Sequence, residues 1–290
     1  MGNEGQASPA NGGQASPANG NGRRSWLRDL FGRRRSVSNA PDFSGAPLAL
    51  GEFLHTDLHC HLIPGVDDGV TSIEEALEMI GRLRALGYTG SILTSHIYAD
   101  LYPNSRETLT PGFEHLRAAV AEKFPDYSLH LAAEYFTDAH FADCIASNEL
   151  LWFPGRDAEG NPVKCVLFEF GFHEAPMQAS DIVFQLQLGG YQPVLAHVER
   201  YPYWHNDLSA VEALHERGVW LTLNAASLAG AYGPETYAAA LTVMERGWCR
   251  MVCSDAHGMR HIEALEAVGR SPAVQTWARS TSADLHRNLG

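Results

Sequence analysis

The sequence predicts an α/β protein in which parallel strands alternate with helices around one barrel. Two observations support this class. From about residue 53 onward, seven short apolar runs alternate with amphipathic stretches of helical length, which is typical of repeated βα units. Metal-binding residue types then follow nearly every apolar run, as expected where functional groups gather at the carboxyl ends of parallel strands. The chain has 290 residues, a common size for a single barrel.

Each predicted strand is a short run rich in apolar residues. The seven runs are Phe53–Leu58, Ser91–Thr94, Ser128–Ala132, Val163–Phe168, Gln192–Ala196, Val219–Leu223 and Arg250–Cys253. Helices are predicted between them, and the clearest is Ile73–Leu86. Thr71 and Glu74 have the spacing of a capping box at the start of this helix, and Gly87 is a stop signal at its end.

The first 50 residues differ in composition from the rest of the chain. Gly5–Gly20 consists of two copies of GQASPANG, and so little apolar content cannot offset the entropy lost on ordering. We therefore predict a disordered basic arm over residues 1–50 and one catalytic domain over residues 51–290.

A short basic stretch, Arg23–Ser36, lies within the arm. It reads RRSWLRDLFGRRRS, and its apolar residues recur at helical spacing. The stretch is too short to span a membrane. Two interpretations stay open: a linker turn that packs weakly, or a weak contact with an anionic membrane surface or a protein partner.

Charge and cysteine content narrow the class of protein. The formal net charge is −13, and because the arm carries six Arg against three acidic residues, the rest of the chain is more acidic still. Such a domain is a poor candidate for binding nucleic acid, which requires clustered Lys and Arg. The five cysteines form no CxxC pair, and no secretory signal is recognisable. We therefore predict a cytoplasmic protein, peripheral at the inner membrane if the basic stretch is an anchor.

Histidines and carboxylates recur at the ends of the predicted strands. His59 and His61 are two apart in an extended segment, so their side chains point the same way and can bind one metal ion. Five histidines and four carboxylates make up the full set: His59, His61, Asp68, His96, Glu134, Glu169, His197, Asp255 and His257. Structural histidines have no reason to collect on one face of a barrel, so the set predicts a metal centre.

The composition of this set indicates the kind of metal centre. Nine ligands exceed the needs of one ion, which favours a cluster of two or three ions with bridging carboxylates. Mixed imidazole and carboxylate ligands favour manganese, iron or zinc over calcium or magnesium alone. A purely structural site is usually four-coordinate and rich in cysteine, unlike this one. Three divalent ions with four carboxylates would carry a net positive charge, which suits a phosphate ester.

Seven blocks of sequence resemble the polymerase and histidinol phosphatase (PHP) superfamily and, within it, the bacterial capsule-associated tyrosine-protein phosphatases. In chain order they are HCHLIPGVDDG, TSHIYADLYPN, AAEYFTDAHF, VLFEFGF, GYQPVLAHVERYPYW, NAASLAGAYG and SDAHGMRHIEAL, over roughly Phe53 to Ala267. The resemblance implies a distorted seven-stranded TIM-like barrel with three divalent ions, for which manganese is the first expectation and iron, zinc or magnesium are alternatives.

The resemblance also implies how the ligands are shared. The first ion would have four ligands: His59, His61, Glu134 and Asp255. Glu134 would bridge to a second ion, completed by Glu169 and His197. The third ion would have Asp68, His96 and His257.

Two arginines are carried over from the family pattern as phosphate-binding, catalytic residues. Arg200 in AHVERY follows the fifth-strand histidine, and the arginine fork suits bidentate phosphate contacts. The alternative for Arg200 is a surface ion pair with Glu199. Arg260 follows the last histidine, but the segment from His257 is shorter than in many relatives, so this assignment is the weaker one.

The predicted activity is hydrolysis of phosphotyrosine in proteins. No C-x5-R signature follows any cysteine, which excludes the cysteine-dependent mechanism, and a phenolate leaving group has little need of an acid. The resemblance implies a bacterial tyrosine kinase as substrate and regulation of capsule or exopolysaccharide synthesis. The alternatives are a small-molecule phosphatase of the histidinol-phosphate type, a nuclease, and a metal-bearing regulatory scaffold.

Two features of the catalytic site stay open at this point. The general acid could be bound water, a histidine or Asp57. Five aromatic residues near strand ends could flank the phenyl ring of the substrate: Tyr98, Tyr102, Phe136, Tyr201 and Trp204.

Overall fold

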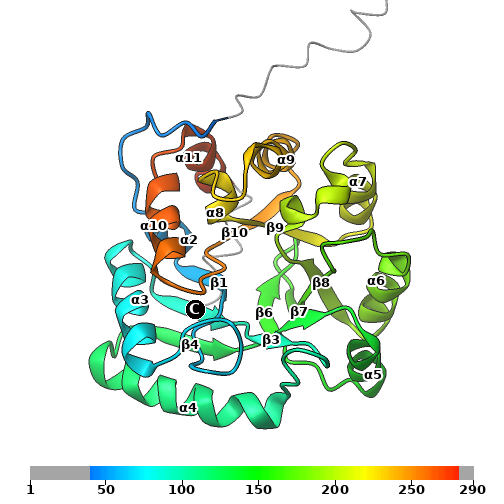
Figure 1. Cartoon of the computed structure of the whole chain (residues 1–290), viewed down its shortest axis with the longest axis horizontal. Coiled ribbons are helices and arrows are strands. Elements are labelled where there is room, and N and C mark those ends of the chain that lie inside the picture. Colours follow the sequence, from blue (N-terminus) through cyan, green and yellow to red (C-terminus); the bar gives the residue numbers. More distant parts are fainter. Residues whose placement is uncertain (1–39, 281–290) are drawn as a thin grey trace, which may run out of the picture. The chain divides into compact units, whose positions relative to one another are not determined.

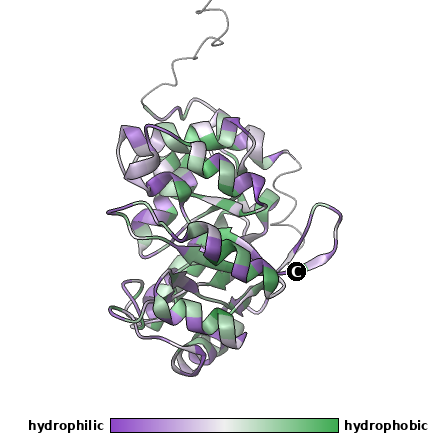
Figure 2. Ribbon diagram, turned by 90° about the vertical axis from the view of Figure 1, so that its right-hand side faces the viewer, coloured by the Kyte–Doolittle hydropathy of each residue, from purple (hydrophilic) through white to green (hydrophobic). Residues whose placement is uncertain are grey.

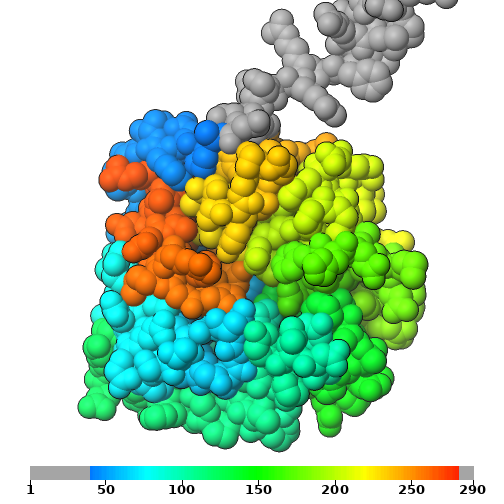
Figure 3. Space-filling view, viewed as in Figure 1, coloured from blue at the N-terminus to red at the C-terminus, as the bar shows by residue number. Residues whose placement is uncertain are grey.

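Parallel strands surrounded by helices make up residues 40–280, the part of the chain that the computed structural model describes (Figure 1). The repeat at Gly5–Gly20 and the basic stretch Arg23–Ser36 lie outside the described residues. Figure 3 shows early, middle and late segments of the described chain side by side on one face. A site on this unit can therefore draw residues from the whole sequence.

The strands form two sheets. The smaller is parallel and has the order β1 (Thr56–Cys60), β2 (Gly90–Leu93), β4 (Ser128–Leu131). The larger has the order β10-β9-β8-β7-β5-β3, again parallel, and β6 is an antiparallel addition to β7. Its strands are β3 (His96–Ile97), β5 (Glu134–Phe136), β6 (Phe153–Arg156), β7 (Pro162–Glu169), β8 (Tyr191–Leu195), β9 (Trp220–Asn224) and β10 (Cys249–Cys253). The prediction of an α/β fold built on parallel strands is confirmed.

The two sheets approach each other at their edges without closing into one ring of paired strands within residues 40–280. At one edge, Cys60 of β1 forms an isolated parallel bridge with Ala256, just after β10. The backbone N–H of Asp255 donates to the carbonyl of His59 at 2.9 Å. At the other edge, only two residues separate β4 from β5. The ends of β1 and β10 therefore lie side by side, although β1 and β10 belong to different sheets.

Helices cover the outside of the sheets, and Figure 2 shows the strands between them as mainly hydrophobic. The α-helices are α2 (Gly51–Leu54), α3 (Ile73–Ala85), α4 (Arg106–Lys123), α5 (Ala139–Ser147), α6 (Ala179–Leu188), α7 (Ser209–Glu216), α8 (Ala225–Leu228), α9 (Pro234–Glu245), α10 (Met259–Val268) and α11 (Pro272–Ala278). Two 3-10 turns, η1 (Val198–Arg200) and η2 (Pro202–Trp204), follow β8. Among the described residues, no helix combines the length and apolar character needed to cross a membrane.

The helix α3 starts at Ile73, as predicted, but its N-cap differs from the prediction by one residue. Ser72, not Thr71, is the N-cap, and its hydroxyl accepts a hydrogen bond from the N–H of Glu75 at 3.2 Å. Thr71 instead donates its own N–H to the Glu75 carboxylate at 2.9 Å. Neighbouring Ser and Thr are equally good caps, so spacing alone could not choose between them. Gly87 ends the helix with φ +92°, as its stop signal predicts.

Strand boundaries differ where polar or turn residues enter a strand. The prediction that a strand starts at Phe53 is wrong, because Phe53 lies in α2 and β1 begins at Thr56. The short strands β3 and β5 were not predicted, since each has only two or three residues. The strand β6 reads FPGR, and its Pro and Gly are typical of turns and of edge positions.

Interior side chains from both sheets form one apolar core. Its buried members include Leu58 from β1, Ile92 from β2, Leu167 from β7, Val194 from β8 and Met251 from β10. Residues 40–50, which the sequence assigns to the arm, also pack on this unit: Leu50 is only 2% exposed, and the N–H of Gly45 donates to the carbonyl of Arg270 at 3.0 Å.

We expect Leu167→Ala to lower the free energy of unfolding by about 2–5 kcal/mol, because it leaves a cavity at the centre of the core. The matched control is Leu188→Ala on α6, where the side chain is 71% exposed and the loss should stay within about 0.5 kcal/mol. Urea unfolding of both variants measures the two values. Equal losses would contradict this placement of the core.

Candidate metal centre

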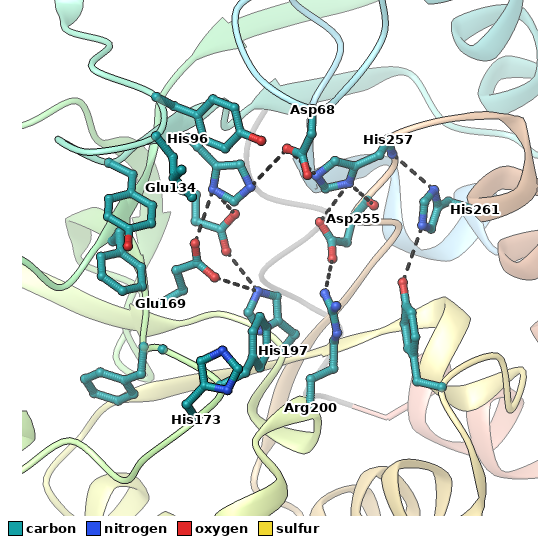
Figure 4. A pocket seen from close by; sticks show the side chains of 18 of the residues that line it. Asp68, His96, Glu134, Glu169, His173, His197, Arg200, Asp255, His257 and His261 are labelled. Carbon is teal, nitrogen blue, oxygen red and sulfur yellow. Dashed lines mark hydrogen bonds and ion pairs between the residues drawn. The ribbon is translucent and has the colours of Figure 1, made fainter.

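Eight of the nine predicted ligand residues lie at the carboxyl end of a strand or within four residues of it, and Asp68 lies in the loop eight residues after β1. Seven of the nine line one cavity of about 490 Å³: Asp68, His96, Glu134, Glu169, His197, Asp255 and His257. The other two, His59 and His61, are fully buried and contact Glu134 and Asp255. In Figure 4 these seven side chains lie around a shared space and point toward one another.

Four of these residues bring one atom each to a common point. His59 Nε2 lies 3.1 Å from His61 Nε2, 3.2 Å from Glu134 Oε2 and 3.3 Å from Asp255 Oδ1. His61 Nε2 lies 3.4 and 3.5 Å from the same two oxygens. Ligand atoms around a tetrahedral zinc-like ion are about 3.3–3.6 Å apart. The group thus has nearly the spacing of a coordination shell, and it is the set predicted for the first ion.

The charges in this group also fit a bound cation. Although burial raises the pKa of Glu134, the surrounding histidines hold that pKa well below its ordinary value. Burial likewise raises the pKa of Asp255, but the neighbouring histidines hold that pKa well below its ordinary value. Glu134 Oε1 and Asp255 Oδ1 are buried without a hydrogen-bond partner. Buried anions of this kind need positive charge beside them, which divalent ions supply.

Two further groups of ligand atoms lie beside the first. Asp68 Oδ1 is 3.5 Å from the Nε2 atoms of both His96 and His257, in a group that also includes His61. His96 Nδ1 lies 3.2 Å from Glu134 and 3.3 Å from Glu169, and these three form the last group. The same two carboxylates lie 3.1 and 3.6 Å from His197 Nε2, the residue assigned there from sequence. Glu134 therefore contacts both groups: its Oε2 lies near His59, His61 and His96, and its Oε1 lies near His197.

Asp67 orients one of the buried histidines and was not predicted as a functional residue. Its Oδ2 accepts from His61 Nδ1 at 2.9 Å and from the N–H of His96 at 3.0 Å, while Oδ1 accepts from Gly69. The first contact fixes the His61 ring so that Nε2 faces the metal group, which is the usual carboxylate support of a ligand histidine. The pair Asp67-Asp68 in the turn was a signal, but sequence could not tell the ligand from its neighbour.

Asn224 has a similar supporting role at the end of β9. Its Nδ2 donates to Asp255 Oδ2 at 2.6 Å, which leaves Oδ1 of that carboxylate directed at the histidines. The sequence places Asn224 at a strand end and gives it no strong claim as a metal ligand. Its amide acts instead through Asp255.

Two of the ligand residues have a strained backbone. His197 has φ +32° and Asp255 has φ +47°, and each lies two residues past the end of a strand, β8 and β10 respectively. Left-handed conformations of residues other than glycine cluster at functional sites, where the surrounding structure holds them. The turn at each position aims the side chain back across the strand ends.

Arg200 lies at the edge of the metal groups and faces the cavity. Its Nη1 lies 3.3 Å from Asp255 Oδ2. The alternative of a surface ion pair with Glu199 is wrong, because Glu199 is fully buried and accepts the N–H of Asn224 at 2.8 Å. Arg260 also lines the cavity, with an exposed side chain.

Three of the five aromatic residues considered for the phenyl ring of the substrate belong to the cavity wall. Tyr98, Tyr102 and Phe136 line it, whereas Tyr201 and Trp204 are buried and contribute nothing to its lining. Seven lining residues were not predicted as part of the site: Leu101, Phe170, Gly171, Phe172, His173, Tyr232 and His261. Each lies in a loop or at a helix start, where side-chain direction depends on packing that the sequence does not reveal.

Asp57, one of the open choices for a general acid, lies away from the cavity. It is 1% exposed, and it accepts from Ser254 through both the backbone N–H at 3.0 Å and the hydroxyl at 2.5 Å. Burial raises its pKa to about 6 despite these bonds. Its contacts hold the turn after β10, so it has a structural part in placing Asp255.

Parallel sheets with converging imidazoles and carboxylates at their strand ends define an α/β protein with a side-chain cluster that fits divalent cations. Residues 55–278 match the family model for capsular polysaccharide synthesis, CpsB/CapC, and the chain belongs to this family. The predicted resemblance to capsule-associated phosphatases is confirmed.

The chain is similar to two proteins named as tyrosine phosphatases and to one solved structure. The tyrosine-protein phosphatase YwqE of Bacillus subtilis is 29% identical over 206 residues, which cover 70% of this chain and 78% of YwqE. The putative tyrosine-protein phosphatase CapC of Staphylococcus aureus is 26% identical over 70% of this chain and 77% of its own length. A crystal structure from work on YwqE and on CpsB of Streptococcus pneumoniae, described as metal-dependent tyrosine phosphatases, superposes with a TM-score of 0.69 at 26% identity, covering 81% of this chain and 95% of that one.

We expect His59→Ala to lower the manganese content of the purified protein by about one ion per chain or more, because the first group loses a central ligand. His173→Ala is the matched control, since His173 lines the same cavity, is exposed and belongs to none of the ligand groups. Elemental analysis after dialysis against manganese gives both values. Equal metal content in the two variants would rule out this ligand assignment.

Asp67→Asn should weaken manganese binding about 10- to 100-fold, because the ring of His61 loses its charged support. Asp126→Asn is the control: Asp126 is 67% exposed and pairs only with Arg84 on the surface. Competition with a fluorescent chelator measures the affinities. An unchanged affinity in Asp67→Asn would show that the orientation of His61 is set elsewhere.

Proposed function

We propose that this chain is a metal-dependent phosphoric monoester hydrolase that acts on phosphotyrosine in proteins. One observation carries the proposal: four ligand atoms from distant parts of the chain converge at the strand ends, beside an arginine that faces a cavity. The activity named for the relatives supports the choice of phosphotyrosine.

The proposed centre has three divalent ions, with manganese as the first expectation. The first would be held by His59, His61, Glu134 and Asp255. The second would be shared among Glu134, Glu169 and His197, and the third would be held by Asp68, His96 and His257. When bound, such ions lower the pKa of water toward neutrality and neutralise phosphoryl oxygens. The donor set fits them because it mixes imidazole with carboxylate and contains no cysteine.

The protein's own groups would bind and orient the substrate. The Arg200 guanidinium is planar and rich in N–H donors, so it can contact two phosphoryl oxygens at once. Arg260, exposed at the same cavity, is the second proposed phosphate contact. The phenyl ring would lie against the wall that contains Tyr98, Tyr102 and Phe136. A phenolate is a good leaving group, so the site has little need of a strong general acid.

Fold and cellular setting form part of the proposal. The two sheets, adjacent at β1 and β10 and continuous in sequence from β4 to β5, would together make a distorted seven-stranded barrel. The catalytic domain would span residues 51–290, with residues 40–50 packed on it.

Five free cysteines, four of them buried, support a reducing cytoplasm. The substrate would be a bacterial tyrosine kinase that regulates capsule or exopolysaccharide synthesis. The two proteins would interact at the inner membrane, and Arg23–Ser36 would contact the membrane surface or the partner.

We expect the manganese-loaded protein to hydrolyse a phosphotyrosine peptide faster than histidinol phosphate or an oligonucleotide. Arg200→Ala should keep its metal and lose about 100- to 1000-fold in kcat/KM, because a charged contact to the transferred group is removed. Arg246→Ala is the control, since Arg246 forms a distant surface pair with Glu212.

Three outcomes would contradict parts of this assignment. Preference for histidinol phosphate would favour the small-molecule alternative. Metal binding without cleavage of any phosphoester would favour the regulatory scaffold. Equal activity of Arg200→Ala and Arg246→Ala would remove Arg200 from the phosphate site.

A further inference from the structure

The guanidinium group of Arg200 lies against two aromatic rings from different loops. Its central carbon is 4.4 Å from the ring centre of Tyr232 and 4.9 Å from that of Phe172. Phe172 follows β7, and Tyr232 lies between α8 and α9. Both distances are within the range at which a cation is attracted to the face of a ring. We call Phe172 and Tyr232 the aromatic pair.

Apart from these rings, Arg200 is held weakly. Within residues 40–280 its side chain makes one hydrogen bond, from Nη1 to Asp255 Oδ2 at 3.3 Å, which is long for a charge-assisted contact. That oxygen already accepts a much shorter bond from Asn224, at 2.6 Å. A guanidinium has five N–H donors, so most of them stay available to a phosphate in the cavity.

Nearby carboxylates compete with a phosphate for these donors. Although burial opposes it, Asp255, Glu199 and Glu134 all help to raise the pKa of Arg200. An arginine free to move would be drawn toward these carboxylates and would turn its donors away from the cavity. An aromatic face attracts the cation without using any N–H donor. The aromatic pair can therefore hold the group and leave its donors free.

Tyr232 is restrained by one long hydrogen bond at its hydroxyl and, more firmly, through the backbone of its loop. The backbone N–H of His257 donates to His261 Nδ1 at 3.2 Å, so the proton of the neutral His261 ring is on Nε2. Nε2 then donates to the Tyr232 hydroxyl at 3.4 Å. The loop backbone is also held, since the N–H of Ala231 donates to the carbonyl of Ala226 at 2.9 Å.

Phe172 is fixed from the other side of the cavity. Its ring stacks on Tyr201 with centres 5.5 Å apart. The hydroxyl of Tyr201 accepts from the N–H of Phe170 at 3.0 Å, and the hydroxyl of Tyr203 donates to the carbonyl of Gly171 at 3.1 Å. Two hydrogen bonds therefore hold the residues just before Phe172.

We propose that Phe172 and Tyr232 are positioning residues of the phosphate site, which hold Arg200 with its free N–H donors toward the phosphoryl oxygens. The inference rests on the proposed phosphate-binding function of Arg200. It assigns a role to Phe172 in the block VLFEFGF and to Tyr232 in the block NAASLAGAYG. Neither residue is a predicted metal ligand.

The test is the affinity of the manganese-loaded full chain for inorganic phosphate, measured by calorimetry. Tyr232→Leu should weaken binding about 5- to 30-fold, because one ring face is lost. Tyr232→Phe keeps the face and should stay within about 3-fold of the wild type. Phe172→Leu and Phe172→Tyr form a second pair with the same expectation, and they decide the matter if Tyr232→Leu loses metal or unfolds.

A double-mutant cycle separates positioning from a general structural effect. If the aromatic pair acts through Arg200, adding Tyr232→Leu to Arg200→Ala should weaken phosphate binding by no more than about 2-fold further. Additive losses would overturn the inference, as would equal losses in Tyr232→Leu and Tyr232→Phe.

Failure of the inference and failure of the proposed function give different results. Phosphate binding needs no turnover. If the variants show the expected binding pattern but the protein cleaves no phosphotyrosine, the inference stands and the proposed function is wrong. A protein that cleaves phosphotyrosine while both leucine variants bind phosphate as the wild type does keeps the function and loses the inference.

Discussion

Glu134 is the residue on which the arrangement of the strand ends depends. Its carboxylate lies 3.1–3.4 Å from ring nitrogens of four histidines: His59, His61, His96 and His197. The first two belong to β1 and its end, in the smaller sheet, while the other two belong to β3 and the turn after β8, in the larger one. One buried carboxylate thus connects the ends of both sheets. Because this carboxylate stays an anion although its residue is only 1% exposed, it needs cationic neighbours.

The same requirement explains why the backbone tolerates strain at the ligands. The left-handed conformations of His197 and Asp255 cost about 1–3 kcal/mol each. The strands that precede these residues are anchored in the tightly packed core, which includes Leu167 and Val194. Binding of cations to the preformed carboxylate and imidazole groups would offset the strain and the charge together. Metal binding in this centre is therefore linked to the stability of the fold.

The ligand positions could be predicted from sequence because parallel topology places strand ends together. Once the apolar runs were recognised, a histidine or carboxylate just after a run had few other places to lie. The supporting residues could not be found in this way. Asp67 differs from Asp68 only in which way its side chain turns, and Asn224 acts through a hydrogen bond to Asp255, which follows 31 positions later. Such contacts depend on tertiary packing.

Local structure was predictable where one residue type is required and less so where several serve. Gly87 was identified as the end of α3 because its φ of +92° favours glycine. The cap at the other end was misplaced, since Thr71 and Ser72 are both suitable. The strand β6 was missed because Pro154 and Gly155 are typical of turns, and only its edge position beside β7 allows them in a strand.

Asp255 connects the metal groups to the phosphate side of the cavity through its two oxygens. Oδ1 faces His59 and His61, while Oδ2 contacts Asn224 and Arg200. A change at Asp255 must therefore affect metal binding and the placement of Arg200 together. A change in the aromatic pair reaches Arg200 without touching either oxygen. Substitutions in these loops can thus change the affinity for a phosphate while the carboxylates at the strand ends stay the same.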